Sequence, residues 1–193
     1  METSKNGLNL IKQFEGCHLT SYKCPGGVWT IGYGHTAGVT EGNHITQEQA
    51  EQYLKDDIKR FEQYVTNYAN KYGYKLNQNQ FDALVSFTYN AGPGNLDRRL
   101  LSKGSRPIEL VKLYLPTVSI SSKGRTLPGL VRRRVAEADL MGDCRKDLKL
   151  VAKEVLDGKW SNGQARRRQL EDCGYSYEEV QRLVTLLVNG EEI

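Results

Sequence analysis

Two stretches of this sequence begin with the start signal of an α-helix and continue with apolar residues at helical spacing. One capping box starts at Thr46 and another at Asn77, each with a glutamine three residues later. Apolar side chains three or four residues apart follow each box. This pattern predicts a helix over residues 47–68 and a second helix that ends at the segment NAGPG, residues 90–94. The fold is therefore expected to be mainly helical.

A smaller part of the chain carries signals of extended structure. The segment VWTIGYG, residues 28–34, alternates β-branched and aromatic residues with glycines, which predicts a strand. The polar segment SISSKGRTLPGL, residues 119–130, is predicted to be a loop. Residues 131–141 then resume a helix with three arginines in its first turns. The fold class is α+β, mostly helical.

The end of the chain predicts three short helices. Apolar residues recur at i, i+3, i+4, i+7 and i+8 from Leu148 to Leu156 and again from Val180 to Val188. Breaks at KWSNG and CGYSY leave residues 164–172 as a middle helix. Together these helices predict a three-helix bundle, a size at which folding without help is marginal.

The predicted boundary between two domains is a short, charged segment over residues 142–147. It would join a first domain, residues 1–141, to the bundle, residues 148–193. The composition, 38% hydrophobic and 26% charged, is typical of a soluble globular protein.

Several classes of protein do not fit the sequence. No apolar run approaches the roughly 18 residues of a membrane span, and the N-terminus lacks the pattern of a signal peptide, so we expect the protein to stay in a cytoplasm. Four cysteines match no zinc spacing, and no metal or cofactor is expected. The net charge of +4 suits an anionic polymer such as nucleic acid or a bacterial wall, but it is not specific.

The first candidate for chemistry is Glu15, which closes a helical pattern just before Gly16. A carboxyl beside Phe14 and an aromatic strand would lose solvent, and desolvation raises the pKa of a carboxyl toward the value that a general acid needs. The alternative is a solvated glutamate at the end of a helix.

The spacing around Glu15 resembles that of a known family. Eight residues separate Glu15 from Cys24, and five more separate Cys24 from Thr30 in the strand that leads to His35. This arrangement resembles the phage-type lysozymes, glycoside hydrolase family 24, over about residues 6–141. The segments FDALVSFTYNAG and LPGLVRRRVAEADL also resemble an inner and a final helix of that family. The resemblance implies a lysozyme-like domain with a small β-hairpin lobe.

That resemblance also implies an activity. Such enzymes cleave the β-1,4 bond between N-acetylmuramic acid and N-acetylglucosamine in peptidoglycan, with inversion at the anomeric carbon. Glu15 would protonate the leaving oxygen, while Cys24 and Thr30 would hold the attacking water on the opposite face. The implied substrate contacts are Tyr33, Asn90, and Arg132 or Arg133.

Cys24 departs from the commoner pattern, because most relatives have Asp at this position. A thiol with its ordinary pKa is mostly protonated at neutral pH and is a weak hydrogen-bond partner. Either a neighbour lowers the pKa of Cys24, or Cys24 only orients the water. A covalent thioglycoside is less favoured because inversion needs no nucleophilic side chain, and a buried, inert thiol is a further alternative. Cys17 is expected to pack.

A rival hypothesis pairs Cys24 with His35 as a cysteine amidase or endopeptidase that cuts the peptide stems. No third, orienting residue is evident, and in the lysozyme family the matching histidine is structural. His18 and His44 are expected on the surface.

The C-terminal segment, residues 150–184, resembles the Cpl-seven-type (CW-seven) cell-wall-binding repeat. The resemblance implies recognition of a muropeptide, with Arg166 as the first contact and Asp157, Trp160 and Arg167 after it. Trp160 offers a face for a sugar, and the arginines offer planar forks for carboxylates. Trp160 is equally suited to fill the small core. Because the chain has one repeat, self-association would add avidity.

Together these features indicate a modular endolysin, held in the host cytoplasm until a separate pore protein lets it reach a Gram-positive wall. No nucleic acid or membrane insertion is expected. The runner-up is a non-catalytic protein that binds a wall or nucleic acid, suggested by the arginine runs at 98–99, 132–134 and 166–168.

Overall fold

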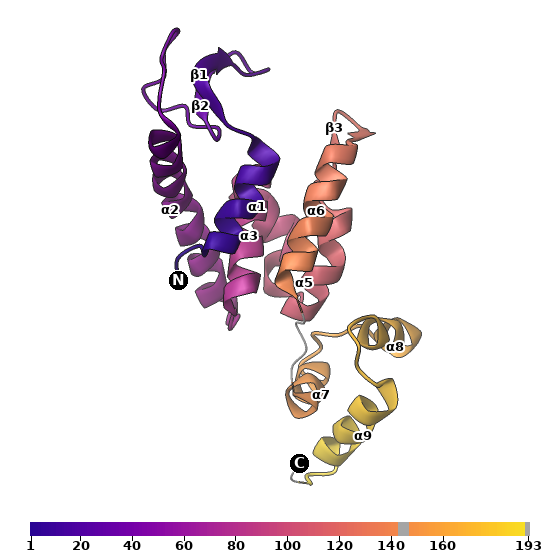
Figure 1. Ribbon diagram of the computed structural model, residues 1–193. Helices are drawn as coiled ribbons and strands as arrows, with labels where there is room; N and C mark the ends of the chain where they lie inside the picture. Colours follow the sequence, from indigo (N-terminus) through magenta and orange to yellow (C-terminus); the bar gives the residue numbers. More distant parts are fainter. Residues whose placement is uncertain (143–146, 192–193) are drawn as a thin grey trace. The chain divides into compact units, whose positions relative to one another are not determined.

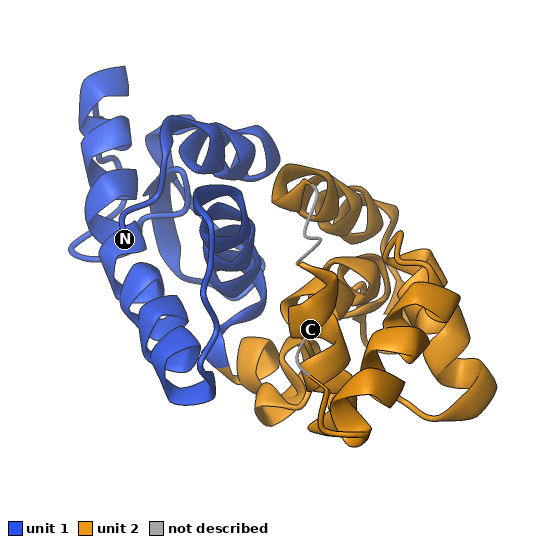
Figure 2. Ribbon diagram, turned by 90° about the horizontal axis from the view of Figure 1, so that it is seen from below, with its two compact units in different colours: residues 1–93 blue, residues 94–193 orange. Residues whose placement is uncertain are grey.

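The computed structural model describes residues 1–142 and 147–191 (Figure 1). The chain divides into two compact units, residues 1–93 and residues 94–193, and each is described by itself (Figure 2). Most of the predicted linker at 142–147 lies outside the described residues.

The first unit contains three helices and one hairpin. Helix α1 (Lys5–Glu15) leads into strands β1 (His18–Lys23) and β2 (Trp29–Gly32), which pair antiparallel. Helices α2 (Gln47–Tyr72) and α3 (Gln78–Ala91) follow. Helix α3 lies at the centre of this unit, since α1 and α2 both pack on it and its residues 80–88 are all buried.

The helix starts agree with the capping signals. Both capping boxes are formed, because the side chains of Thr46 and Asn77 accept hydrogen bonds from backbone N–H groups three residues on and the reciprocal glutamine bonds are present. Helix α2 runs four residues beyond the predicted end and stops at Gly73, which has a left-handed φ of 72°. The predicted strand is shorter than expected, with β2 ending at Gly32.

The second unit starts with short helical segments. These are α4 (Pro93–Asn95), the π-helical turn η1 (Leu96–Leu100), the 3-10 turn η2 (Ser102–Gly104), α5 (Ile108–Tyr114) and the 3-10 turn η3 (Leu115–Thr117). A small hairpin, β3 (Ser121–Ser122) and β4 (Arg125–Thr126), precedes helix α6 (Pro128–Met141). The prediction of a loop over residues 119–130 was therefore wrong in part. Two residues with positive φ, Lys123 at 49° and Gly124 at 75°, form the turn of this hairpin.

The three C-terminal helices are present as predicted: α7 (Leu148–Leu156), α8 (Gly163–Asp172) and α9 (Tyr177–Val188). Their shared core consists mainly of aliphatic side chains with Trp160 and Tyr175, and Leu110 of α5 belongs to the same buried cluster. Among the described residues, none of the helices has the length and hydropathy needed to cross a bilayer.

Candidate active site

The position of Glu15 depends on how α1 is anchored. The backbone N–H of Ser4 donates to Asp82 Oδ1 at 2.9 Å, and the Ser4 hydroxyl donates to Asp82 Oδ2. Asp82 is fully buried on α3, so this cap ties the start of α1 to the centre of the unit. At the other end Gly16 adopts a φ of 69° and ends the helix, which leaves Glu15 half-buried at the entrance to the hairpin.

Cys24 and Thr30 lie close together at the tight end of the β1–β2 hairpin. The Cys24 N–H donates to Val28 O at 3.0 Å, and the Gly27 N–H donates to Cys24 O at 2.8 Å, so the turn is closed by backbone bonds. Thr30 is 4% exposed, and its hydroxyl donates to Val28 O at 3.1 Å. Cys24 is partly exposed.

The surroundings of Cys24 stabilise its thiolate. The backbone N–H groups of Val28 and Gly26 lower the pKa of the Cys24 thiol most, desolvation opposes them, and the Gly27 N–H adds a smaller decrease. These donors agree with the alternative in which neighbours lower the pKa of Cys24. Because thiolate is a better acceptor than thiol, the turn prepares Cys24 to accept a hydrogen bond from water.

Tyr22 is a residue of the site region that was not predicted from the sequence. Burial raises the pKa of the Tyr22 phenol, and the negative charges of Cys24 and Glu15 raise it further, so both groups lie near this ring. The signal was present in the hairpin, because Tyr22 is the β1 residue that pairs with Thr30 of β2. Strand pairing therefore places Tyr22 opposite Thr30, and the charges of Glu15 and Cys24 act on its phenol.

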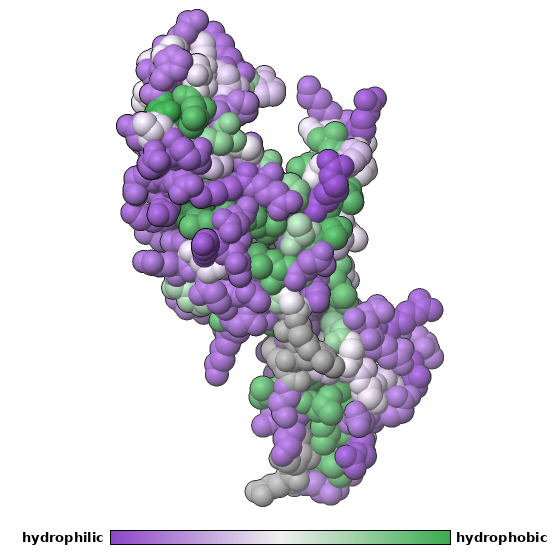
Figure 3. Space-filling model, in the orientation of Figure 1, coloured by the Kyte–Doolittle hydropathy of each residue, from purple (hydrophilic) through white to green (hydrophobic). Residues whose placement is uncertain are grey.

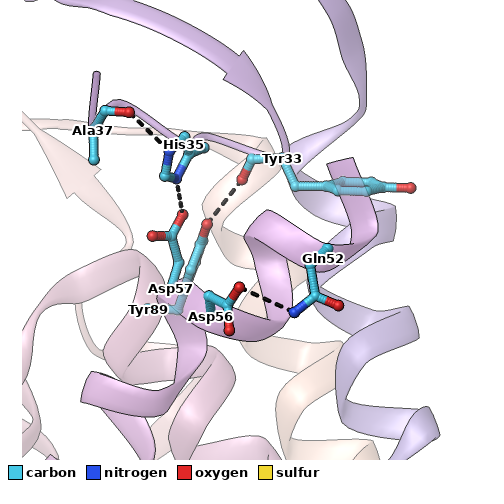
Figure 4. Close-up of polar contacts among 7 residues, drawn as sticks. All are labelled: Tyr33, His35, Ala37, Gln52, Asp56, Asp57 and Tyr89. Atoms are coloured by element: carbon cyan, nitrogen blue, oxygen red, sulfur yellow. Dashed lines mark hydrogen bonds and ion pairs between the residues drawn. The ribbon is translucent and has the colours of Figure 1, made fainter. Parts of the chain in front are cut away.

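His35 has a structural role in the site. Its Nδ1 lies 2.8 Å from Asp57 Oδ2 on α2, and its Nε2 lies 3.0 Å from the Ala37 carbonyl oxygen (Figure 4). Its ring also stacks on Tyr53 with centroids 4.4 Å apart. Both ring nitrogens face acceptors other than Cys24, which argues against the hypothesis of a cysteine–histidine pair.

Tyr33 connects the hairpin to the helices α2 and α3. It is 7% exposed, its carbonyl oxygen accepts from the Tyr89 hydroxyl at 2.8 Å, and its own hydroxyl oxygen accepts from Gln47 Nε2 at 2.8 Å (Figure 4 draws the first bond). Lys12 Nζ lies 5.6 Å from the centre of the ring. The predicted contact of Tyr33 with the substrate stays a prediction, since the Tyr33 hydroxyl accepts from Gln47 and keeps its own proton to donate.

The other predicted substrate contacts are of two kinds, one buried and two exposed. Arg133 is 3% exposed and its Nε lies 3.2 Å from Glu137 Oε1 on the same helix, so it serves a buried ion pair and the substrate role is corrected. Asn90 and Arg132 are exposed. They are the two that remain accessible to a ligand. Cys17 is also exposed, so the expectation that it packs was wrong.

In the C-terminal bundle, Trp160 is part of the core. It is 2% exposed, its Nε1 donates to Glu154 Oε2 at 3.3 Å, and its ring meets Tyr175 edge-on with centroids 6.0 Å apart. A buried ring cannot stack on a sugar, so the prediction of a ligand contact at Trp160 is wrong. The alternative, in which Trp160 fills the small core, agrees with the structure.

The arginines of α8 are more accessible. Arg166 is half-buried and donates to the Ser161 carbonyl and to Asn162 Oδ1, both at 2.7 Å. Arg167 donates to Glu178 Oε1 at 2.6 Å and lies over the Tyr177 ring. Asp157 is exposed at the end of α7. Within residues 1–142 and 147–191 no cluster of His, Cys, Asp and Glu is arranged to hold a metal ion.

Comparison with known proteins identifies both parts of the chain. The sequence model described as "Phage lysozyme" matches residues 12–137. The chain belongs to the phage lysozyme family. A second model, "CW_7 repeat", matches residues 149–188. Residues 138–148 lie between the two matches, and this range contains the predicted linker.

Individual relatives of this phage lysozyme support the same family assignment. It is 38% identical to the endolysin of Acyrthosiphon pisum secondary endosymbiont phage 1, over 72% of this chain and 97% of that protein. It is 43% identical to the endolysin of Lactococcus phage c2, over 72% of this chain but only 60% of that protein. Among solved structures, the muramidase domain of SpmX from Asticaccaulis excentricus superposes with a TM-score of 0.63 at 32% identity, covering 73% of this chain and 97% of that one. The chain is thus a lysozyme-type glycoside hydrolase with a cell-wall repeat.

Proposed function

We propose that this lysozyme is a phage endolysin that hydrolyses the β-1,4 bond between N-acetylmuramic acid and N-acetylglucosamine with inversion. The observation that supports it best is the placement of Glu15 at the end of α1, directly before the hairpin whose turn carries Cys24 next to Thr30. A glycosidic oxygen leaves only when it is protonated, so one group must be an acid and the other must hold the water. The phage lysozyme match and the endolysin relatives supply the substrate class.

In this mechanism Glu15 donates its proton to the leaving oxygen. The attacking water lies on the opposite face of the sugar and donates a hydrogen bond to Cys24. The lowered pKa of the thiol increases the fraction of Cys24 that can accept this bond and draw a proton from the water. The nearly buried hydroxyl of Thr30 donates to the Val28 carbonyl oxygen, so it helps to fix the water as a hydrogen-bond acceptor. No bond forms between Cys24 and the sugar.

The C-terminal repeat would hold the enzyme on the wall. With Trp160 in the core, the proposed contacts to the muropeptide are Arg166, Arg167 and Asp157. Arg168 is the most accessible cation of α8, since it is exposed and has no partner in the described part of the chain. One repeat gives a weak contact, so self-association would raise the avidity. We expect the enzyme to wait in the host cytoplasm for a separate pore protein.

The test is a digestion of purified Gram-positive peptidoglycan by the wild type and by two variants. Glu15→Gln should abolish the release of new reducing ends, because the amide cannot donate the proton, whereas Cys24→Asp should retain it. Glu41→Gln is the matched control, because Glu41 is an exposed glutamate of the same lobe. The α-anomer should be the first product, since inversion converts the β bond.

Three results would contradict the proposal. An active Glu15→Gln would remove the acid from the mechanism. A β-anomer as the first product would replace inversion by retention. New free amines without new reducing ends would move the cut to the peptide stems and restore the cysteine-dependent alternative.

A further inference from the structure

Positive charge is distributed unevenly along this chain. Residues 94–141 contain ten Lys and Arg but four Asp and Glu. Residues 1–93 contain eight against nine, and residues 148–193 contain seven against eight. The whole surplus of positive charge therefore arises between residues 94 and 141, whereas the segment that holds the wall-binding repeat is close to neutral. The repeat does not act as a polycation.

Burial of some charged side chains increases the excess of positive over negative charge at the surface of this segment. Two of the cations, Arg133 and Arg134, are buried and pair with Glu137, which is also buried, and Glu109 is buried as well. Half of the acidic side chains of this segment are thus withdrawn from the surface. Six cations of the same segment remain exposed to solvent: Arg98, Arg99, Lys103, Lys123, Arg125 and Arg132.

The β3–β4 hairpin presents two of these cations together. Residues 121–129 are all exposed, and Lys123 and Arg125 flank the Gly124 turn without an ion pair in the described part of the chain. Backbone pairing of Ser121 with Thr126, and of Ser122 with Arg125, holds the hairpin in shape. In Figure 3 the end of this hairpin, located from the β3 label of Figure 1, is hydrophilic. We call Lys123 and Arg125 the basic hairpin.

The neighbouring helix adds to this positive region. Helix α6 starts two residues after β4, has no acidic residue in its first turn and has no side-chain cap on its first N–H groups. Its positive end therefore lies next to the hairpin in the chain, and exposed Arg132 follows in the second turn. Residues 110–136 contain no Asp or Glu at all, so nothing acidic in this stretch offsets the charge.

We propose that the basic hairpin binds anionic groups of the bacterial wall polymer, either phosphodiesters of wall polymers or carboxylates of stem peptides. This rests on the proposed function, which makes the wall the substrate. The lysozyme part would then supply an electrostatic, salt-dependent attachment in addition to the contact that the repeat makes. Two such contacts on one chain reinforce each other.

The experiment measures co-sedimentation of the full chain with purified Gram-positive walls, in the Glu15→Gln background so that the walls stay intact. The test variant is Lys123→Gln/Arg125→Gln. The matched control is Lys5→Gln/Lys75→Gln, which removes two exposed cations of the first unit. Glutamine at position 123 keeps an unbranched polar side chain and must adopt the same positive φ that Lys123 has, so the fold is expected to survive. Thermal unfolding of each variant verifies this.

At low salt a cation near an anionic surface contributes about fivefold to affinity. The hairpin variant should therefore bind roughly tenfold more weakly or worse, and the control should change less than twofold. The difference should shrink at high salt, because the Debye length falls from about 10 Å at 0.1 M to about 3 Å at 1 M. Hydrolysis of short soluble muropeptides by the same double variant, made with Glu15 intact, should equal that of the wild type.

Walls treated with hydrofluoric acid, which removes phosphodiester-linked polymers, separate the two sources. If the hairpin variant and the control bind these treated walls equally, the anionic groups are phosphodiesters. If the hairpin variant still binds more weakly, the anionic groups are carboxylates. Equal wall binding by the hairpin variant and the control would overturn the proposal. Binding of each variant to duplex DNA is measured in the same way. A hairpin variant that loses affinity for DNA but not for walls would also overturn the proposal. A parallel loss of soluble-muropeptide hydrolysis would place the hairpin in the substrate site and also overturn it. Co-sedimentation measures wall binding in a variant that does not hydrolyse the wall. A failure of the proposed function would instead appear in the peptidoglycan digestion, so the two failures can be distinguished.

Discussion

Gly7→Ala should destabilise the unit that carries Glu15, although alanine is the better helix former. A Cβ at position 7 would lie 2.6 Å from Thr3 Cγ2, 2.8 Å from Asp82 Cγ and 2.9 Å from Asp82 Cβ. The carboxyl of Asp82 cannot retreat freely, because it is fully buried and binds Ser4. Overpacking of this kind costs about 1–3 kcal/mol, and the gain in helix propensity is at most about 1 kcal/mol. The net loss in the free energy of unfolding should be up to about 2 kcal/mol.

For a chain of this size such a loss lowers Tm by up to about 8 °C, which circular dichroism can measure. The control is Gly129→Ala in the first turn of α6, where a Cβ would meet no atom within 4 Å. That variant should be as stable as the wild type or gain up to about 1 kcal/mol. Because α1 also positions Glu15, Gly7→Ala should slow peptidoglycan hydrolysis below its melting range. A Gly7→Ala protein that melts at or above the wild-type Tm would refute the reasoning.

Three further predictions concern single side chains. Asp57→Asn should weaken the bond to His35 and lower the free energy of unfolding by about 1–2 kcal/mol, seen as a lower urea midpoint; an unchanged midpoint would leave the contact without energetic value. Trp160→Ala should cost about 3–5 kcal/mol because the ring is buried, whereas Leu156→Ala, at a side chain 48% exposed, should cost less than about 1 kcal/mol. Equal thermal unfolding of these two variants would contradict the core role. If the thiolate of Cys24 is the active form, as we propose, hydrolysis should rise with pH at values below the ordinary thiol pKa of 9.0, because the pKa of Cys24 is lowered. Cys24→Ser should lose that rise, and a profile identical to the wild type would exclude the thiolate.

Local sequence signals were sufficient to predict a structural feature where its bonds join residues that are close together in the chain. The capping boxes at Thr46 and Asn77 form because their bonds span only three residues, and Gly16 ends α1 because it reaches a backbone conformation that other residues avoid. The hairpin at residues 121–126 was missed for the opposite reason. Two-residue strands made of polar side chains show no alternation, so only the paired backbone reveals them.

The sequence by itself determined the order of the helices and the β-hairpin, because helix periods and caps are local in the chain, and the Glu15–Cys24–Thr30 spacing, also local, predicted the residues of the reaction. Tertiary structure alone decided which side chains are free to act. Trp160 and Arg133 had the chemistry of ligand contacts, yet packing buries both. Tyr22 became part of the site only through strand register. Burial and pKa depend on atoms brought together from distant positions, and no local pattern records those neighbours.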